Sequence, residues 1–270
     1  MAKQPGRPSA GAPFIIFAGQ EGSGKTTALV RLVEEFGGAI IPTEDGLQAA
    51  EDRDVVAFDV CALSTPDKPE AFLDDLYESF GWCWDNLQKG QVLGVDTISV
   101  LYQRLEQTVL NRYGESNIAA CAGGYGKGFL EIRKEMMEII DTLQAMRREL
   151  DVGIICTSHM SAGVIKNSPD VEAALVYTLA FDEKSAQLWR QQCQALLCIG
   201  FDTVVSGVET DNKGVVKKAG RVIKNSKRHL ICDASIPAYS QLAKNRFNLP
   251  AKIVFPEDDL TWIDSINWFK

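Results

Sequence analysis

The sequence predicts an α/β protein with a mostly parallel central sheet and an antiparallel extension at one edge. Strand-like runs rich in Val and Ile alternate with amphipathic helical segments through most of the chain. Such a pattern favours a parallel sheet covered by helices on both faces. Beyond about Phe201 the pattern changes to consecutive short strand-like runs, which predicts the antiparallel extension.

Composition and charge describe an ordinary globular protein. The chain has 270 residues, of which 46% are hydrophobic and 24% charged, and its formal net charge is -8. The longest apolar candidate, 173–181, is about half as long as a membrane span requires. The apolar run 14–17 is too short for a signal peptide. The seven cysteines include no CxxC pair, so we expect a reducing cytoplasm and no membrane partner.

The predicted elements begin after a flexible tail at residues 1–12, which is rich in Gly, Pro, Ser and Ala. The run PFIIFAG predicts the first strand, and TTALVRLVEEF predicts a helix that ends at Gly37 and Gly38. The next predicted elements are strands at AIIPTE, VVAFDV, QVLGVD and DVGIICTSH, and helices over 69–87, 99–112 and 129–150.

The less regular segments come later in the chain. Residues 113–128 are rich in glycine and predict a long loop. The runs TVVSGVE, VVKKAGRVIKN and RHLICD predict short antiparallel strands. Residues 236–270 contain Pro237, Pro250 and Pro256 and predict an irregular C-terminal extension.

A phosphate-binding loop is predicted at residues 19–26, which satisfy GxxxxGK[ST] between a predicted strand and a predicted helix. Glycines let backbone N–H groups face phosphates, and the helix start is positive. Lys25 is expected to contact the outer phosphates and the Thr26 hydroxyl to bind Mg²⁺. The alternative is that the motif occurs by chance, but a chance occurrence would not be expected to lie between a predicted strand and a predicted helix. The predicted nucleotide contacts are Gly19, Gln20, Glu21, Gly22, Ser23, Gly24, Lys25, Thr26 and Thr27.

Three further polar residues follow predicted strands. Asp96 closes QVLGVD, where a carboxylate can hold the metal. Glu44 is preferred over Asp45 as the residue that orients or deprotonates water, although a polar turn before Gly46 is the alternative. His159 follows GIICTS and is a candidate to contact the γ-phosphate, or else a loop histidine bonded to backbone.

Two groups of cations suggest anionic partners. Seven basic residues lie within sixteen positions that contain no acid, which favours an anionic partner, a neighbouring subunit's ATP, or a solvated hairpin face. They are Lys213, Lys217, Lys218, Arg221, Lys224, Lys227 and Arg228. A second group combines cations and aromatic residues around flexible glycines, which suits single-stranded nucleic acid unless the rings pack into the core. It comprises Arg112, Tyr113, Tyr125, Lys127 and Phe129.

The motifs GQEGSGKTT, PTEDG, VLGVDTIS, ICTSH and RVIKN occur in the order and rough spacing of the RecA-like ATPase core. The chain resembles the short RecA-like ATP-binding proteins of bacteriophages, a group that includes single-strand annealing recombinases. The resemblance covers residues 12–233, and the segment AKNRFNLP also looks like that group. It implies a RecA-like P-loop NTPase core over 13–235 that binds ATP and Mg²⁺.

The resemblance also implies roles for individual residues. It makes Glu44 the residue that activates water, Asp96 the metal-associated aspartate and His159 a switch before a DNA-binding loop. Lys224 is expected to reach the ATP of the adjacent subunit, with Lys227 or Arg228 as a second contact at a spacing that departs by one residue. DNA-facing loops are implied at 112–128 and 160–170, with Arg112, Tyr125, Lys127 and Lys166 as candidate contacts.

We therefore expect a DNA-stimulated ATPase of phage recombination or repair. It would bind single-stranded DNA, assemble as a ring or filament, and work beside a single-strand-binding protein. The alternative is a P-loop ATPase, small-molecule kinase or assembly switch that does not bind DNA. A third reading is a scaffold that holds ATP without hydrolysing it. A GTPase is disfavoured because the sequence lacks an NKxD motif.

Overall fold

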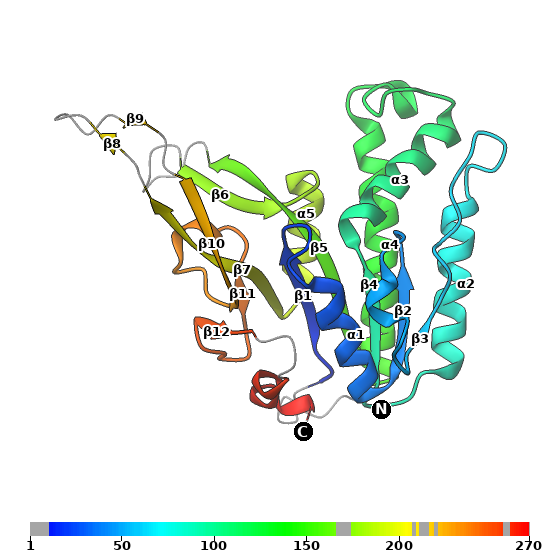
Figure 1. The fold of residues 1–270 in the computed structure, drawn as a ribbon. Helices are drawn as coiled ribbons and strands as arrows, with labels where there is room; N and C mark the ends of the chain where they lie inside the picture. The colour runs from blue at the N-terminus through cyan, green and yellow to red at the C-terminus, as the bar shows by residue number, and fades with distance from the viewer. Residues whose placement is uncertain are drawn as a thin grey trace, which may run out of the picture.

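The computed structural model describes residues 11–165, 174–206, 209–210, 216–218, 221–255 and 260–269. A large twisted sheet runs through these residues, with helices on both of its faces (Figure 1). In space its strands follow the order β12-β10-β7-β1-β5-β4-β2-β3. Their bounds are β1 (Phe14–Gly19), β2 (Gly38–Pro42), β3 (Val56–Ala57), β4 (Val92–Asp96), β5 (Gly153–Ile165), β7 (Ala195–Ser206), β10 (Arg221–Ile231) and β12 (Lys252–Val254).

The central strands of this sheet are parallel. Strand β1 lies between β5 and β7 and runs parallel to both, while β4 runs parallel to β5 and β2. At one edge β10 pairs antiparallel with β7, and β12 pairs antiparallel with β10. This order confirms the predicted fold class, an α/β core with a mostly parallel sheet and an antiparallel edge extension.

Helices cover the two faces unequally. Alternate residues of β1 face opposite ways, so Ile15 and Phe17 pack with α1, whereas Phe14 and Ile16 pack with the other helices. Burial on both faces explains why the strands are continuous apolar runs rather than alternating ones. The helices are α1 (Lys25–Phe36), α2 (Ala71–Asn86), α3 (Ile98–Tyr113), α4 (Lys127–Glu149) and α5 (Glu183–Gln192).

The N-terminal half follows the predicted pattern closely. Helices α2, α3 and α4 confirm the predictions over 69–87, 99–112 and 129–150. Of the predicted tail, residues 1–10 lie outside the described residues. Ala12 is buried, and its N–H donates to Asp151 Oδ1 at 3.2 Å while its carbonyl accepts from Arg147. The packed chain therefore already includes Ala12.

The C-terminal half departs from the predicted pattern. RVIKN and RHLICD are not separate short strands but one strand, β10, with a register shift between Lys224 and Arg228. The predicted loop 160–170 is wrong for residues 160–165, which complete β5 and pair with β6 (Ala174–Leu179). Sequence reasoning missed both β6 and α5. The short strands β8 (Glu209–Thr210) and β9 (Val216–Lys218) form a separate pair.

The predicted irregular extension packs against the core. It contains β11 (Lys244–Asn245), β12 and three short 3-10 helices, Pro237–Tyr239, Thr261–Ser265 and Asn267–Phe269. Trp262 and Ile263 are buried on the face that α1 covers. The ammonium of Lys244 donates to carbonyl groups at the end of α5, including those of Gln191 and Cys193, where a cation complements the helix dipole. Lys244 of the AKNRFNLP segment therefore stabilises the end of α5.

The helices of the described residues are not membrane spans. Among the described residues, none combines the length and the apolar character needed to cross a bilayer.

Candidate functional site

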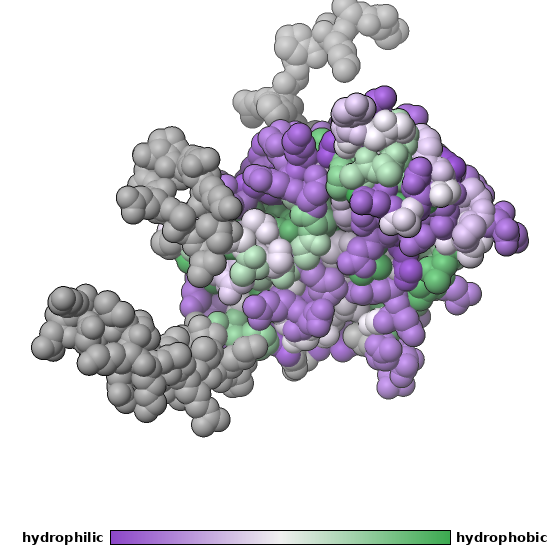
Figure 2. All heavy atoms as spheres, turned by 90° about the horizontal axis from the view of Figure 1, so that it is seen from above, coloured by the Kyte–Doolittle hydropathy of each residue, from purple (hydrophilic) through white to green (hydrophobic). Residues whose placement is uncertain are grey.

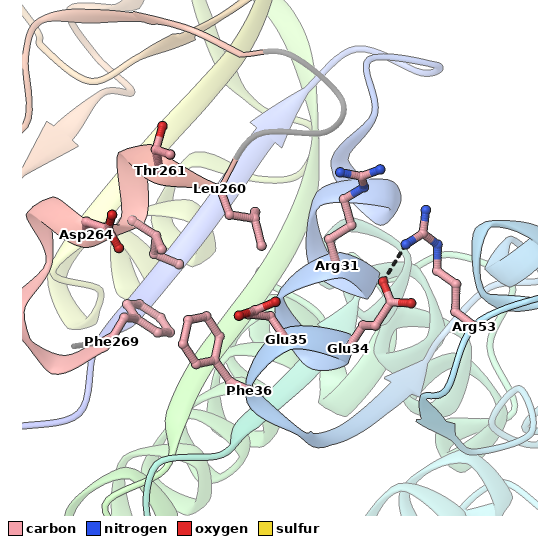
Figure 3. A pocket seen from close by; sticks show the side chains of 10 residues that line it. Arg31, Glu34, Glu35, Phe36, Arg53, Leu260, Thr261, Asp264 and Phe269 are labelled. Carbon is pink, nitrogen blue, oxygen red and sulfur yellow. Dashed lines mark hydrogen bonds and ion pairs between the residues drawn. The ribbon is translucent and has the colours of Figure 1, made fainter.

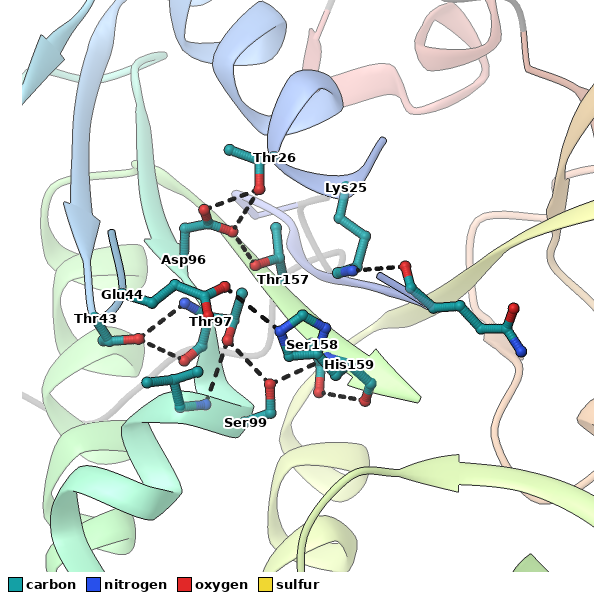
Figure 4. Close-up of polar contacts among 12 residues, drawn as sticks. Lys25, Thr26, Thr43, Glu44, Asp96, Thr97, Ser99, Thr157, Ser158 and His159 are labelled. Carbon is teal, nitrogen blue, oxygen red and sulfur yellow. Dashed lines mark hydrogen bonds and ion pairs between the residues drawn. The ribbon is translucent and has the colours of Figure 1, made fainter. Parts of the chain in front are cut away.

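The predicted catalytic residues and the predicted phosphate-binding loop meet at one edge of the sheet. β1, β2 and β4 end there, and β5 passes through the same edge at His159, because these parallel strands point the same way. This edge is where open α/β sheets bind ligands. Figure 4 shows side chains from β2, β4 and β5 at this edge, and from the start of α1, turned toward one another. They include Lys25, Thr26, Glu44, Asp96 and His159.

The loop between β1 and α1 has the backbone that its glycines permit. Gly22 and Gly24 have φ values of 68° and 93°, in the left-handed region where a side chain is strained. A Cβ on Gly19 would lie 2.3 Å from Ser23 Oγ, so that position has no room for a side chain. The loop leads directly into α1, whose first turn begins with the Ala28 N–H donating to the Gly24 carbonyl at 3.0 Å.

Lys25 is buried at the start of α1, with 5% of its surface exposed. Its Nζ donates to the Gln20 carbonyl at 3.0 Å. Burial lowers the pKa of Lys25, and the nearby carboxylates of Asp96 and Glu44 oppose that shift. A buried ammonium beside the positive end of a helix favours an anion, because a bound phosphate offsets the cost of removing the charge from water.

Asp96 lies beside Thr26 and is almost fully buried, with 1% exposed. Thr26 Oγ1 donates to Asp96 Oδ2 at 3.0 Å, and Thr157 Oγ1 donates to Oδ1. Burial raises the pKa of Asp96, against the lowering effect of these two hydroxyl hydrogen bonds. A hydroxyl and a carboxylate in contact offer the oxygen ligands that Mg²⁺ prefers, so the residues present fit this metal.

Glu44 and His159 are in contact. Glu44 Oε1 lies 3.5 Å from His159 Nε2, and the hydrogen bond with His159 holds the pKa of Glu44 below its ordinary value. Glu44 is therefore ionised at neutral pH and close enough to Lys25 for their charges to interact. Asp45, the alternative weighed from the sequence, is exposed.

Hydroxyl groups connect the strand ends to one another. Thr43 Oγ1 accepts from the Thr97 N–H at 2.9 Å and donates to the Thr97 carbonyl at 2.8 Å. Ser99 Oγ lies 2.9 Å from Thr97 Oγ1 and accepts from the His159 N–H at 3.1 Å. The peptide bond between Asp96 and Thr97 is cis. The ends of β2, β4 and β5 are thus tied into one buried polar network.

Sequence reasoning missed these hydroxyl residues. Thr43 and Thr97 stand directly after strands, in PTEDG and VDTIS, Ser99 stands in the first turn of α3, and Thr157 interrupts an apolar strand. Polar residues in buried strands and just beyond them need hydrogen-bond partners, which was the available signal.

The basic segment is only partly described. Arg228 lies next to Gly24 of its own chain, where a Cβ would be 2.8 Å from Arg228 Nη1. Lys227 is exposed, and the backbone of Lys224, in β10, pairs with that of Thr203 in β7. Lys166 and Lys213 lie outside the described residues. The expected contacts of Lys224 and Lys227 with an adjacent subunit stay predictions.

Arg112 is held by protein carboxylates, and its predicted contact with DNA stays a prediction. Its Nε and Nη2 donate to the two oxygens of Glu70, each at 2.7 Å, and its Nη1 donates to Glu135 Oε1 at 2.8 Å. Two carboxylates neutralise the guanidinium and occupy its donors, so Arg112 braces α3 against its neighbours. In contrast, Tyr125, on the connection between α3 and α4, and Lys127, the first residue of α4, are exposed.

A separate cavity of about 650 Å³ lies at the other end of α1 (Figure 3). It separates the last turns of α1 from the C-terminal 3-10 helices and contains the ion pair between Arg53 and Glu34. Its walls carry both signs of charge, including Arg31, Glu35 and Asp264. The predicted site residues lie at the opposite end of the helix.

Comparison with known proteins gives one family match. The model of a family described as AAA domain matches residues 13–247. No curated protein matches the chain. Among solved structures, the RadB recombinase has a TM-score of 0.45 and 14% identity over 92% of this chain and 90% of its own. The flagellar accessory protein FlaH from Methanocaldococcus jannaschii has a TM-score of 0.39 and 12% identity over 91% and 85%. Likeness at this level says nothing about activity.

Proposed function

The chain belongs to the AAA domain family, and we propose that it is a Mg²⁺-dependent P-loop ATPase that binds single-stranded DNA during recombination or repair. The contact of Thr26 with Asp96, beside the buried Lys25, carries the nucleotide-binding part of this proposal. We propose further that it acts as a homo-oligomer in DNA recombination, as the resemblance to phage RecA-like ATPases implies. A single-strand-binding protein as partner stays a prediction.

In this proposal, different residues of the site bind the phosphates of ATP, hold Mg²⁺ and activate water. Backbone N–H groups of the loop 19–24 and the start of α1 face the phosphates, and Lys25 adds a full positive charge. Thr26 and Asp96 would hold Mg²⁺, which supplies neutralisation of phosphate charge when bound. Glu44, ionised at neutral pH, would orient water or accept its proton.

His159 could couple nucleotide binding to the position of β5 and β6. It contacts Glu44 through its ring and Ser99 through its backbone N–H. The strand β5 continues from His159 without a break to Ile165, where it pairs with β6. A change in the position of His159 on ATP binding would therefore be passed to the β5–β6 hairpin.

The α3–α4 connection supports the DNA-binding part. It projects beyond the ends of the strands (Figure 1), and Tyr125, two residues before the start of α4, is fully exposed. Tyr125 has a φ of 56°, which is rare for a bulky residue, and it stands two residues before Lys127. An exposed ring beside a cation suits stacking on a base next to a phosphate. Seen from this end, neutral and hydrophobic residues gather between hydrophilic ones (Figure 2).

A second candidate function is a P-loop ATPase, kinase or assembly switch that does not bind DNA. The neutralisation of Arg112 by Glu70 and Glu135 favours it, as does the net charge of -8, because both weaken attraction to a polyanion.

ATP hydrolysis with and without single-stranded DNA separates the two candidates. It should be measured at low salt with Mg²⁺ for the wild type, for Lys25→Ala and for Lys184→Ala, which removes an exposed lysine from α5 as a matched control. We expect DNA to stimulate the wild type and Lys184→Ala, and no hydrolysis by Lys25→Ala. Hydrolysis that ignores DNA, together with no DNA binding in the presence of a non-hydrolysable ATP analogue, would favour the second candidate.

A salt titration tests the nature of the DNA contact. Each phosphate contact releases counterions, so DNA affinity should fall steeply as salt rises. An affinity independent of salt contradicts binding through phosphates.

A further inference from the structure

Arg228 projects toward the face of the sheet that α1 covers. In a strand, alternate residues face the same way, so Arg228 shares its face with Leu230 and Cys232. Leu230 is buried in the same hydrophobic cluster as α1, whereas Ile231 belongs to the cluster on the opposite face. The alternation of β10 therefore directs Arg228, and not its neighbour Lys227, toward the phosphate-binding loop.

The guanidinium of Arg228 lies directly against this loop. A Cβ on Gly24 would be 2.8 Å from Arg228 Nη1, 3.4 Å from Cζ and 3.9 Å from Nε. All three distances place the planar group over Gly24, the residue immediately before Lys25. Arg228 also lies over the ring of Phe201, its partner across β7, with 5.7 Å from Cζ to the ring centroid. The side chain thus reaches the loop of its own chain from a neighbouring strand.

Three sources of positive charge converge at Gly24. They are the start of α1, the ammonium of Lys25 and the guanidinium of Arg228. Asp96 also bonds to Thr26 and Thr157, and Glu44 contacts His159, while both carboxylates and that of Glu21 attract the charge of Lys25. A phosphate group bound at this loop would be attracted by each of these three positive groups.

We propose that Arg228 binds the phosphates of a nucleotide held by the same chain, as a second cation beside Lys25. The proposal rests on the proposed ATP binding and names a residue that completes that site. It differs from the role implied by the resemblance, in which a cation of this segment reaches the ATP of the adjacent subunit. A guanidinium can donate two parallel hydrogen bonds to one phosphate, which an ammonium cannot reproduce.

Nucleotide affinity of the dissociated chain tests this assignment. A fluorescent ATP analogue with Mg²⁺ should be titrated into dilute protein, at concentrations where sedimentation shows separate chains. We expect Arg228→Ala to bind at least about tenfold more weakly than the wild type, the loss expected for a charged hydrogen bond. Arg228→Lys should fall between them. Lys252→Ala, which removes an exposed cation from the neighbouring strand β12, should bind like the wild type.

The outcomes separate this inference from the proposed function. Equal affinity of Arg228→Ala and wild type as separate chains overturns the assignment, as does a wild type that binds nucleotide only when assembled. A wild type that binds no nucleotide at any concentration contradicts the proposed ATPase itself. Thermal unfolding identifies a variant that fails to fold, and Arg228→Gln, which keeps most of the side chain's length, then takes the place of Arg228→Ala.

Mixed assemblies give a second and independent test. Arg228→Ala and Lys25→Ala chains should be produced together in equal amounts, and their ATP hydrolysis compared with that of each variant alone. If Arg228 serves its own chain, the mixture hydrolyses no more than the average of the two variants. If Arg228 serves a neighbour, about a quarter of the sites regain both cations and activity returns, because subunits pair at random across the interface.

Discussion

The strand-end site and the α3–α4 connection lie at the same end of the sheet and are built in opposite ways. At the strand ends, the reactive side chains are buried and fixed by hydrogen bonds, as Asp96 is by Thr26 and Thr157. Beside the connection, Arg112 near the end of α3 is paired with two carboxylates, and Tyr125, just before α4, is fully exposed. In our proposal, one region binds nucleotide with preorganised polar groups, and the other offers a ring and a lysine to single-stranded DNA.

This difference shows which chemistry a short sequence motif can specify. The P-loop lies within nine residues and carries its own glycines, cation and hydroxyl groups. The charge of Arg112 depends on Glu70 and Glu135, which are 42 and 23 residues away. A motif therefore predicts a site when the groups that determine its charge are local in the chain.

The largest effect is expected at the buried region, from Glu44→Gln. Removing the carboxylate that orients or deprotonates water should lower turnover by about a hundredfold or more, while ATP affinity stays within a few fold. Steady-state hydrolysis and nucleotide titration measure the two quantities, and Asp45→Asn is the matched control because Asp45 is exposed one residue away. If Glu44→Gln and Asp45→Asn hydrolyse ATP equally well, the water-activating role belongs to another residue.

A smaller effect is expected at the exposed region, from Tyr125→Ala. Loss of the ring should weaken single-stranded DNA binding by about tenfold, the value of one stacked base, and leave ATP affinity unchanged. Tyr125→Phe should retain DNA affinity because it retains the ring. Fluorescence anisotropy with a labelled oligonucleotide makes this comparison. Equal binding by Tyr125→Ala and wild type would remove the main support for the α3–α4 connection as a DNA contact.

The sequence predicted the sheet class, helices α1 to α4 and the residues that meet at the strand ends, because these follow from periodicity and from local motifs. It did not predict α5 or β6, and it divided β10 into two strands. A register shift between Lys224 and Arg228 interrupts the alternation of β10, so the sequence pattern resembles a turn. The hydroxyl network through Thr43 and Ser99 depends on contacts between strands that are distant in the chain.

Arg112→Ala sharpens the comparison because it separates stability from DNA binding. The guanidinium is 27% exposed and holds Glu70 and Glu135 together, so its loss should lower the free energy of unfolding by about 1 to 2 kcal/mol. DNA affinity, measured beside Tyr125→Ala, should change by less than about twofold once both are compared as folded protein. Chemical denaturation gives the stability. A DNA affinity that falls as far as in Tyr125→Ala, with stability unchanged, would return Arg112 to the DNA-binding surface.

The smallest effect is the acid dependence of the same ion pairs. The hydrogen bond from Arg112 holds the pKa of Glu70 below its ordinary value of 4.5. A carboxyl group whose pKa is lower in the folded chain stabilises the fold above its unfolded pKa, and this stability is lost as the pH falls through the folded pKa. Glu70 is 40% exposed, so water screens the pair and its share is less than about 1 kcal/mol. The difference in unfolding free energy between wild type and Arg112→Ala should therefore be largest at neutral pH and shrink below about pH 4. Other acid-sensitive groups are common to both chains and cancel in this difference, so a difference that stays constant down to pH 3 would mean that Arg112 acts through packing rather than through its charge.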